Sequence, residues 1–188
     1  MCELIFGKKK VNMHVIFQQS LKATLDYANW KKDKTGENLH KTFYRHFISI
    51  MCDASRINNS SLCGSSYIIV ADNQCIVQAG VASSTQETSL HAELAALEEA
   101  LKQCRERSLN PNQIFSDCLA MLELIQRNQP RLNGRFQDGV WNIKNLLNHN
   151  PEMVLEYIPC ELNSVADVLA NFGRKIKPDN HPISQRPQ

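Results

Sequence analysis

Hydrophobic residues are grouped first in short apolar runs and later in repeats with helical spacing. Apolar runs at 47–52, 67–70 and 75–77 predict three strands, with a polar hairpin turn between the last two. The first run leads directly to Asp53, and polar residues at 55–61 predict a loop after it. Because the three strands follow one another closely, we expect them to pair antiparallel.

The rest of the pattern predicts helices that alternate with two further strands. Leucines and small residues recur at three- and four-residue spacing over 89–107, which is typical of a helix with one buried face. The later elements are a strand at 114–115, helices at 119–125 and 134–148, a strand at 154–158 and a helix at 163–173. Strands connected through helices favour parallel pairing, so the pattern predicts an α/β fold, a mixed sheet with helices packed on it.

Composition divides the chain into three parts. Residues 1–45 are more basic than the rest, and apolar residues within 11–30 have helical spacing, so we expect a basic amphipathic helix and a linker there. Residues 46–175 hold the predicted sheet and form the main domain. Residues 176–188 are rich in proline and polar residues, which predicts a disordered tail.

Bulk composition is that of one ordinary domain. The 21 basic and 19 acidic residues give a formal net charge of +2, so a nucleic-acid function must be argued from a site. The seven cysteines include no CxxC pair, which favours free thiols in a reducing compartment over disulfides or structural zinc. No stretch approaches the ~20 apolar residues of a membrane span, and no secretion signal is evident, so we expect an intracellular protein.

Four acidic residues are candidates for chemistry. Asp53 and Asp117 each follow an apolar strand, whereas Glu93 and Asp167 lie near the starts of helices. Carboxylates gathered at one place repel each other unless a cation holds them, and their oxygens suit Mg²⁺ or Mn²⁺. Two such ions about 4 Å apart can activate a water and stabilise a leaving oxygen. Four convergent carboxylates would offer that chemistry.

Each acid also has an ordinary structural explanation. Asp117 is placed to cap the helix that follows it, and Glu93 gains from the helix macrodipole. Asp167 lies off the apolar stripe of its helix, where a solvated carboxylate is common, and Asp53 is compatible with a loop. Spacing alone leaves open whether the four acids converge.

Short motifs carry the four acids in a fixed order. They read CDAS at 52–55, AELAAL at 92–97, SDC at 116–118 and NSVADVLA at 163–170. Together they resemble the RNase H-like domain of plant proteins, found also at the carboxyl end of plant non-LTR retrotransposon polyproteins. The order and separations agree over about residues 46–174. The resemblance suggests a detached terminal piece or a domesticated copy of such a polyprotein.

This resemblance implies a five-stranded mixed sheet, with three antiparallel strands followed by two parallel ones. It implies a metal-dependent endonuclease that hydrolyses the RNA strand of RNA–DNA hybrids, using two Mg²⁺ or Mn²⁺ ions. Asp53 would bridge the ions, Glu93 and Asp117 would flank one, and Asp167 would bind the other. Substrate contacts are expected from two further residues, Ser55 and Asn163. The expected partner is RNA–DNA hybrid or double-stranded RNA, and we expect a monomer.

Three positions depart from the family pattern. Cys160 stands where the family usually has an arginine, so a phosphate-binding cation is lost. The stretch 64–66 is poorer in glycine than the usual second strand, and the loop 159–162 lacks the histidine of many cellular RNases H. His91 is close to Glu93 in sequence, but helical geometry turns it elsewhere, so we expect a structural role.

The sequence leaves two other functions open. The fold could serve as a catalytically weak or inactive nucleic-acid-binding module, which the loss of the arginine at position 160 favours. Alternatively, the basic amino-terminal part could make the protein an interaction domain. The presence of all four acids favours the enzyme.

Overall fold

The computed structural model describes residues 3–6, 9–12, 48–57, 61–71, 76–127 and 134–175. Near the amino terminus, β1 (Glu3–Phe6) and β2 (Lys9–Asn12) pair as an antiparallel two-stranded sheet. The prediction of an amino-terminal helix within 11–30 is wrong at its start, because Val11 and Asn12 belong to β2. The rest of that helix, the linker and the tail at 176–188 lie outside the described residues.

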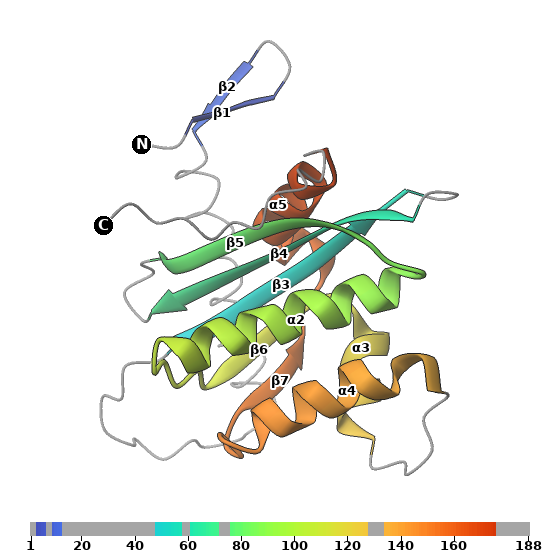
Figure 1. Ribbon diagram of the computed structural model, residues 1–188. Coiled ribbons are helices and arrows are strands. Elements are labelled where there is room, and N and C mark those ends of the chain that lie inside the picture. Colours follow the sequence, from blue (N-terminus) through green and yellow to red (C-terminus); the bar gives the residue numbers. More distant parts are fainter. Residues whose placement is uncertain are drawn as a thin grey trace, which may run out of the picture.

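The main body is a five-stranded sheet in the order β5-β4-β3-β6-β7 (Figure 1). Its strands are β3 (Ile48–Arg56), β4 (Leu62–Ala71), β5 (Ile76–Thr85), β6 (Gln113–Ser116) and β7 (Val154–Tyr157). Strands β3, β4 and β5 are antiparallel, and β6 and β7 continue the sheet in parallel with β3. The predicted mixed sheet, with three antiparallel and then two parallel strands, is confirmed.

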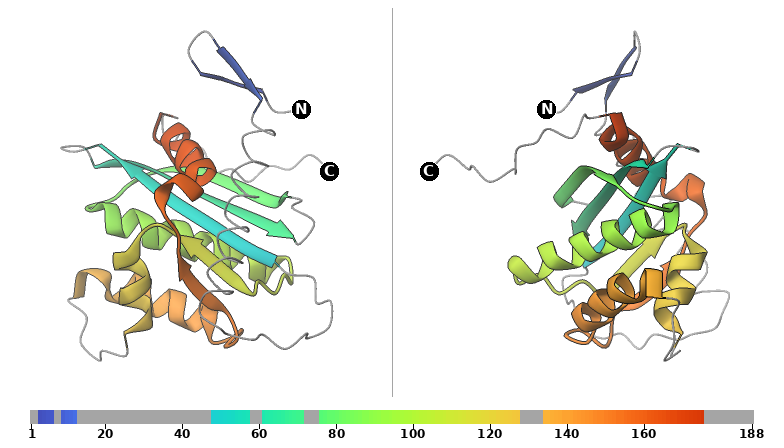
Figure 2. Two further views of the ribbon diagram at one scale, coloured as in Figure 1. Left: turned by 180° about the vertical axis from the view of Figure 1, so that it is seen from behind. Right: turned by 45° about the vertical axis from the view of Figure 1, so that its right-hand side comes forward.

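Helices cover both faces of the sheet, and each face has its own apolar core. The helices are α2 (Ser89–Glu106), α3 (Leu119–Gln126), α4 (Gly134–Leu147) and α5 (Ser164–Lys175), with a short 3-10 helix η1 (Cys160–Leu162) before α5. One core packs α2, α3 and α4 against residues such as Ile50 and Cys52 of β3. The other core packs α5 against Met51 and Ile68, and Figure 2 shows α5 on the face opposite α2. No helix among the described residues is long and apolar enough to span a membrane.

The three antiparallel strands are longer than their apolar runs predicted. Strand β3 continues to Arg56, so Asp53 lies inside the strand and pairs with Ser66, and the loop expected at 55–61 begins later. Strand β4 begins at Leu62, and β5 continues to Thr85. These extensions consist mostly of small and polar residues, which the backbone ladder pairs although no hydrophobic alternation marks them.

Helix α5 approaches the backbone of β4 most closely at Gly64 and Ser66, where small residues face it. A Cβ atom added to Gly64 would lie 1.9 Å from the Ala170 carbonyl oxygen and 2.3 Å from the Arg174 nitrogen. The buried hydroxyl of Ser66 donates a 2.6 Å hydrogen bond to the Ala166 carbonyl oxygen. The glycine-poor stretch at 64–66 therefore keeps a glycine, Gly64, at the position where α5 requires one. This contact fixes the position of α5, which carries Asp167.

Replacing Gly64 with alanine is expected to destabilise the fold strongly. The new methyl group would overlap two backbone atoms that can move only if α5 shifts, which should cost on the order of 3 kcal/mol in the free energy of unfolding. Urea denaturation followed by circular dichroism measures this change.

Gly139→Ala is the matched control, because its Cβ would meet only Leu94 at 3.8 Å. Alanine at this position in α4 should raise stability, by up to about 1 kcal/mol, since it favours helix. Equal stability of Gly64→Ala and the wild type would contradict the close seating of α5.

Candidate functional site

The site lies where β6 separates from the central strand β3. Their parallel pairing runs from Ser49 opposite Gln113 to Met51 opposite Phe115, and β6 ends at Ser116. Beyond Met51 the edge of β3 that faced β6 pairs with no strand among the described residues. This divergence makes room for side chains at the carboxyl end of a strand, where open α/β sheets commonly hold ligands.

Asp53 occupies the centre of this opening. Asp53 is 5% exposed, its side chain lies on the α5 face of β3, and its Oδ2 has no hydrogen-bond partner. Burial, and then the negative charges of Asp117 and Asp167, raise the pKa of Asp53 from 3.8 to about 8, against one stabilising backbone hydrogen bond from Ala54. An ordinary surface carboxylate is neither buried nor shifted in pKa in this way, so Asp53 is not a simple solvated acid.

Glu93 reaches the same place from α2 on the other side of β3. It is 8% exposed, and its Oε2 is buried without a partner. Burial, then the charges of Asp53 and Asp117, raise its pKa to about 9. The macrodipole explanation is therefore insufficient, because Glu93 is buried beside two other acids and lies beyond the first turn of the helix.

The start of α2 is fixed by a cap that also explains His91. The Thr88 hydroxyl accepts a 3.2 Å hydrogen bond from the His91 backbone nitrogen and lies 2.9 Å from the ring Nδ1. The His91 ring stacks on Phe136 of α4 with centroids 4.4 Å apart. These contacts agree with the expected structural role of His91, and they set the register that turns Glu93 towards Asp53.

Asp117 is held by a side chain and does not cap the next helix. The N-cap residue of α3 is Cys118, which makes no side-chain capping bond, so the capping explanation for Asp117 is wrong. Asp117 Oδ1 accepts a 2.8 Å hydrogen bond from Asn163 Nδ2, which also donates to the Cys52 carbonyl oxygen at 3.0 Å. Asn163 thus links the free edge of β3 to the end of β6.

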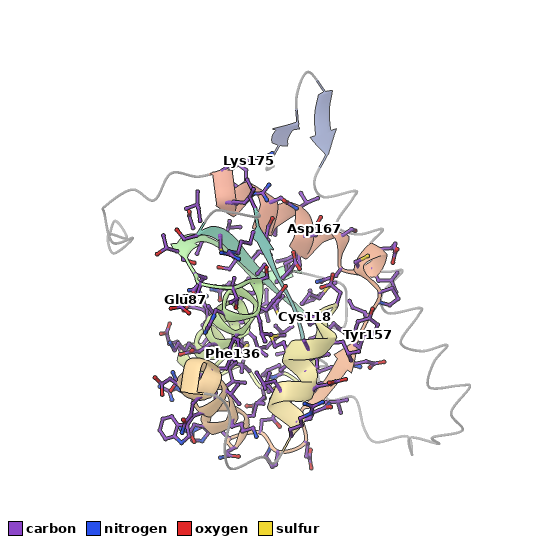
Figure 3. All side chains as sticks on the ribbon, turned by 90° about the vertical axis from the view of Figure 1, so that its right-hand side faces the viewer. Glu87, Cys118, Phe136, Tyr157, Asp167 and Lys175 are labelled. Atoms are coloured by element: carbon purple, nitrogen blue, oxygen red, sulfur yellow. The ribbon has the colours of Figure 1, made fainter. Side chains whose placement is uncertain are left out.

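Asp167 comes from the first turn of α5 and is the one exposed member of the four acids. Figure 3 shows Asp167 on α5 and Cys118 at the start of α3, both on the side that faces the viewer. The Oδ1 atom of Asp167 accepts a 2.8 Å hydrogen bond from Asn171 Nδ2. The sequence reasoning missed Asn171, whose only signal was its spacing of four residues from Asp167 on a helix.

The electrostatic interactions identify Asp53 as the residue that links the other acids. Asp117 and Asp167 both act on Asp53, while Asp53 and Asp117 both act on Glu93. Even so, no three His, Cys, Asp or Glu side chains of the described part of the chain meet at the distances of a formed metal site. Like charges separate or take up protons when no cation offsets them. The two unpartnered carboxylate oxygens and the all-oxygen donor set nevertheless fit a hard divalent cation.

The two expected substrate contacts are already bonded within the protein. Ser55 is 9% exposed, and its hydroxyl donates to Asn171 Oδ1 at 2.7 Å. Asn163 is 0% exposed and uses its amide nitrogen on Cys52 and Asp117. Both residues therefore hold the site together, and a contact of either with a substrate stays a prediction.

The thiols of Cys52 and Cys118 lie beside the acidic cluster and add no metal ligands to it. Burial and then the charge of Glu93 raise the pKa of Cys52 well above its ordinary value and that of Cys118 to about 11. Both are therefore protonated, unreactive thiols at neutral pH. The described cysteines Cys52, Cys63, Cys104, Cys118 and Cys160 are all free.

Comparison with known proteins supports the fold. The family model described as reverse transcriptase-like matches residues 51–173, whereas a search of curated proteins gives no match. RNase H1 of Halobacterium salinarum is 18% identical, with a TM-score of 0.62 over 67% of this chain and 96% of that one. The amino-terminal RNase H domain of a Mycobacterium tuberculosis protein is 16% identical, with a TM-score of 0.63 over 68% and 98%.

A third similar structure is an RNase H1 isolated from compost, in complex with RNA/DNA hybrid. It is 20% identical, with a TM-score of 0.60 over 66% of this chain and 94% of that one. At these identities the likeness shows the fold alone, and it confirms the predicted RNase H-like fold.

The metal-free protein is expected to lose stability as pH rises. The pKa values of Asp53 and Glu93 are about 8 and about 9, against ordinary values of 3.8 and 4.5. Between those limits the folded state binds more protons than the unfolded chain, so this stability is complete below the ordinary values and is lost as pH rises through 8 and 9. Urea denaturation in EDTA from about pH 5 to about pH 9 measures the decline.

Asp53→Asn should flatten this dependence. It removes one titrating group and also one of the charges that raise the pKa of Glu93. If wild type and variant show the same slope over that range, the two carboxyl groups do not hold protons as described.

Proposed function

This chain belongs to the reverse transcriptase-like family, and from that membership we propose a metal-dependent endonuclease that cleaves the RNA strand of RNA–DNA hybrids. The observation that carries the proposal is the cluster of four acids from β3, α2, α5 and the end of β6, centred on a buried Asp53. A nuclease needs such a concentration of carboxylate oxygens, whereas a binding module for a polyanion has no use for it. The structure of a compost RNase H1 with RNA/DNA hybrid supports the choice of substrate.

The chain's own residues would divide the work as follows. Asp53 would contact two divalent ions, with Glu93 and Asp117 at one of them and Asp167 at the other. Mg²⁺ or Mn²⁺ bound there would supply positive charge to activate the attacking water and to stabilise the leaving 3′ oxygen. Water adds to the phosphorus as the bond to the 3′ oxygen breaks, which leaves 5′-phosphate and 3′-hydroxyl ends.

Cation binding and protonation compete at this site. Asp53 and Glu93, with pKa values of about 8 and about 9, must release their protons before their oxygens can act as ligands. Affinity for the cation should therefore increase with pH across the neutral range.

The origin of the chain in a plant retrotransposon polyprotein is proposed from the four motifs alone.

The purified protein is expected to cut a labelled RNA–DNA hybrid only when Mg²⁺ or Mn²⁺ is added. Asp53→Asn should abolish cutting, because it removes the oxygen ligand shared by both ions. Gel analysis of the labelled RNA strand, with identification of its new ends, measures this reaction.

Asp138→Asn is the matched control, since it makes the same chemical change at an exposed position on α4 and should leave cutting unchanged. A folded wild type that binds the hybrid but cuts it with neither metal would contradict the nuclease.

The second candidate is a nucleic-acid-binding module with weak or no catalysis, and Cys160 is the observation that favours it. Cys160 is exposed at the start of η1, where the resemblance places an arginine. A cysteine carries no positive charge, and the charge of the neighbouring Glu161 raises the pKa of the Cys160 thiol. Contact with the substrate's phosphates should be weak there.

Cys160→Arg should therefore strengthen binding to the hybrid. Each added phosphate contact releases counterions, so the plot of log affinity against log salt should become steeper by about one unit. Fluorescence anisotropy with a labelled hybrid in EDTA measures affinity without cutting, and Cys160→Ser is the control. An unchanged salt slope would show that position 160 does not face the phosphates.

A further inference from the structure

Asn171 lies between the central strand and the exposed candidate ligand Asp167. Its Oδ1 accepts a 2.7 Å hydrogen bond from the Ser55 hydroxyl on β3. Its Nδ2 donates at 2.8 Å to Asp167 Oδ1 and at 2.9 Å to the Asp167 carbonyl oxygen. A continuous chain of hydrogen bonds therefore runs from β3 through Asn171 to the carboxylate of Asp167.

The chemistry of these partners determines how the amide is oriented. A carboxylate accepts hydrogen bonds only, so the side of Asn171 that faces Asp167 must be its NH₂ group. The opposite side is then the carbonyl oxygen, which suits the Ser55 hydroxyl as donor. A primary amide joins a hydroxyl donor to a carboxylate acceptor in this way, whereas an aspartate at 171 would repel Asp167 and a leucine would bond to neither.

Asp167 needs such a partner more than the other acids do. Asp53 and Glu93 are held by burial, and Asp117 is held by the buried Asn163. Asp167 is exposed, so its side chain would otherwise be free to turn into solvent. Asn171 is itself anchored to Ser55, which is 9% exposed within a strand of the core sheet.

We propose that Asn171 is a positioning residue, which holds the Asp167 carboxylate in the direction of Asp53 and is itself held by Ser55. The inference rests on the proposed function, because Asp167 must be a cation ligand for its direction to matter. Outer partners of metal ligands act in this way, fixing the ligand's orientation before the ion arrives.

The test is Mn²⁺ binding to the full chain without nucleic acid, followed by electron paramagnetic resonance of the free ion. Asn171→Leu should raise the dissociation constant of one ion about tenfold, at the lower end of the range for outer-shell partners because Asp167 itself is exposed. Ser55→Ala should raise it less, since it removes the anchor and keeps the amide. The absence of substrate excludes any effect through a contact of Ser55 with nucleic acid.

Asn142→Leu is the matched control, because its amide also donates to a carboxylate, Glu98 Oε1 at 3.1 Å, on the far side of α2. It should bind Mn²⁺ as the wild type does. Melting temperatures of all variants separate lost affinity from lost fold, and Ser55→Ala decides the question should Asn171→Leu fail to fold.

Wild-type affinity in both Asn171→Leu and Ser55→Ala, with binding lost in Asp53→Asn, would overturn the positioning role and leave the nuclease intact. A wild type that neither binds Mn²⁺ nor cuts hybrid would overturn the proposed function, and this inference with it.

Discussion

The mutual repulsion of carboxylates within a folded core is the constraint on which this structure depends. Asp53 and Glu93 are nearly buried, and one carboxylate oxygen of each has no hydrogen-bond partner; burial, and then the charges of neighbouring acids, raise their pKa values to about 8 and about 9. Such an arrangement opposes folding unless protons or cations compensate it. Two separate apolar cores, one on each face of the sheet, offset this cost because they hold together the strands and helices that carry the acids.

Hydrogen bonds and close contacts around the acidic cluster determine how the side chains of the acids are oriented. Asn163 joins the edge of β3 to Asp117 at the place where β6 leaves the sheet. Gly64 and Ser66 let α5 rest on β4, and Asn171 connects Asp167 to Ser55. Asp117 and Asp167 are thus each held by an asparagine that is bonded to β3, whereas the capped start of α2 orients Glu93. Such preorganisation is what a site for two cations requires.

The order of elements and the α/β class could be predicted from the sequence, because the core strands and helices carry regular hydrophobic spacing. The position of Asp53 inside β3 could not, since Ala54, Ser55 and Arg56 continue the strand by backbone pairing without an apolar signal. The resemblance in motifs predicted that the acids converge, whereas spacing alone left this open. Asn171 was missed because a spacing of four residues from an acid is common on helices and does not by itself single out a hydrogen-bonded pair.

The central claim is that Asp53 is the oxygen ligand around which the other acids gather a divalent cation. The most direct measurement is the anomalous scattering of Mn²⁺ in crystals of the protein grown with that ion. The account predicts anomalous density in contact with Asp53 and with at least one of Glu93, Asp117 and Asp167. Well-ordered crystals at alkaline pH with Mn²⁺ present, and no anomalous density at Asp53, would contradict it.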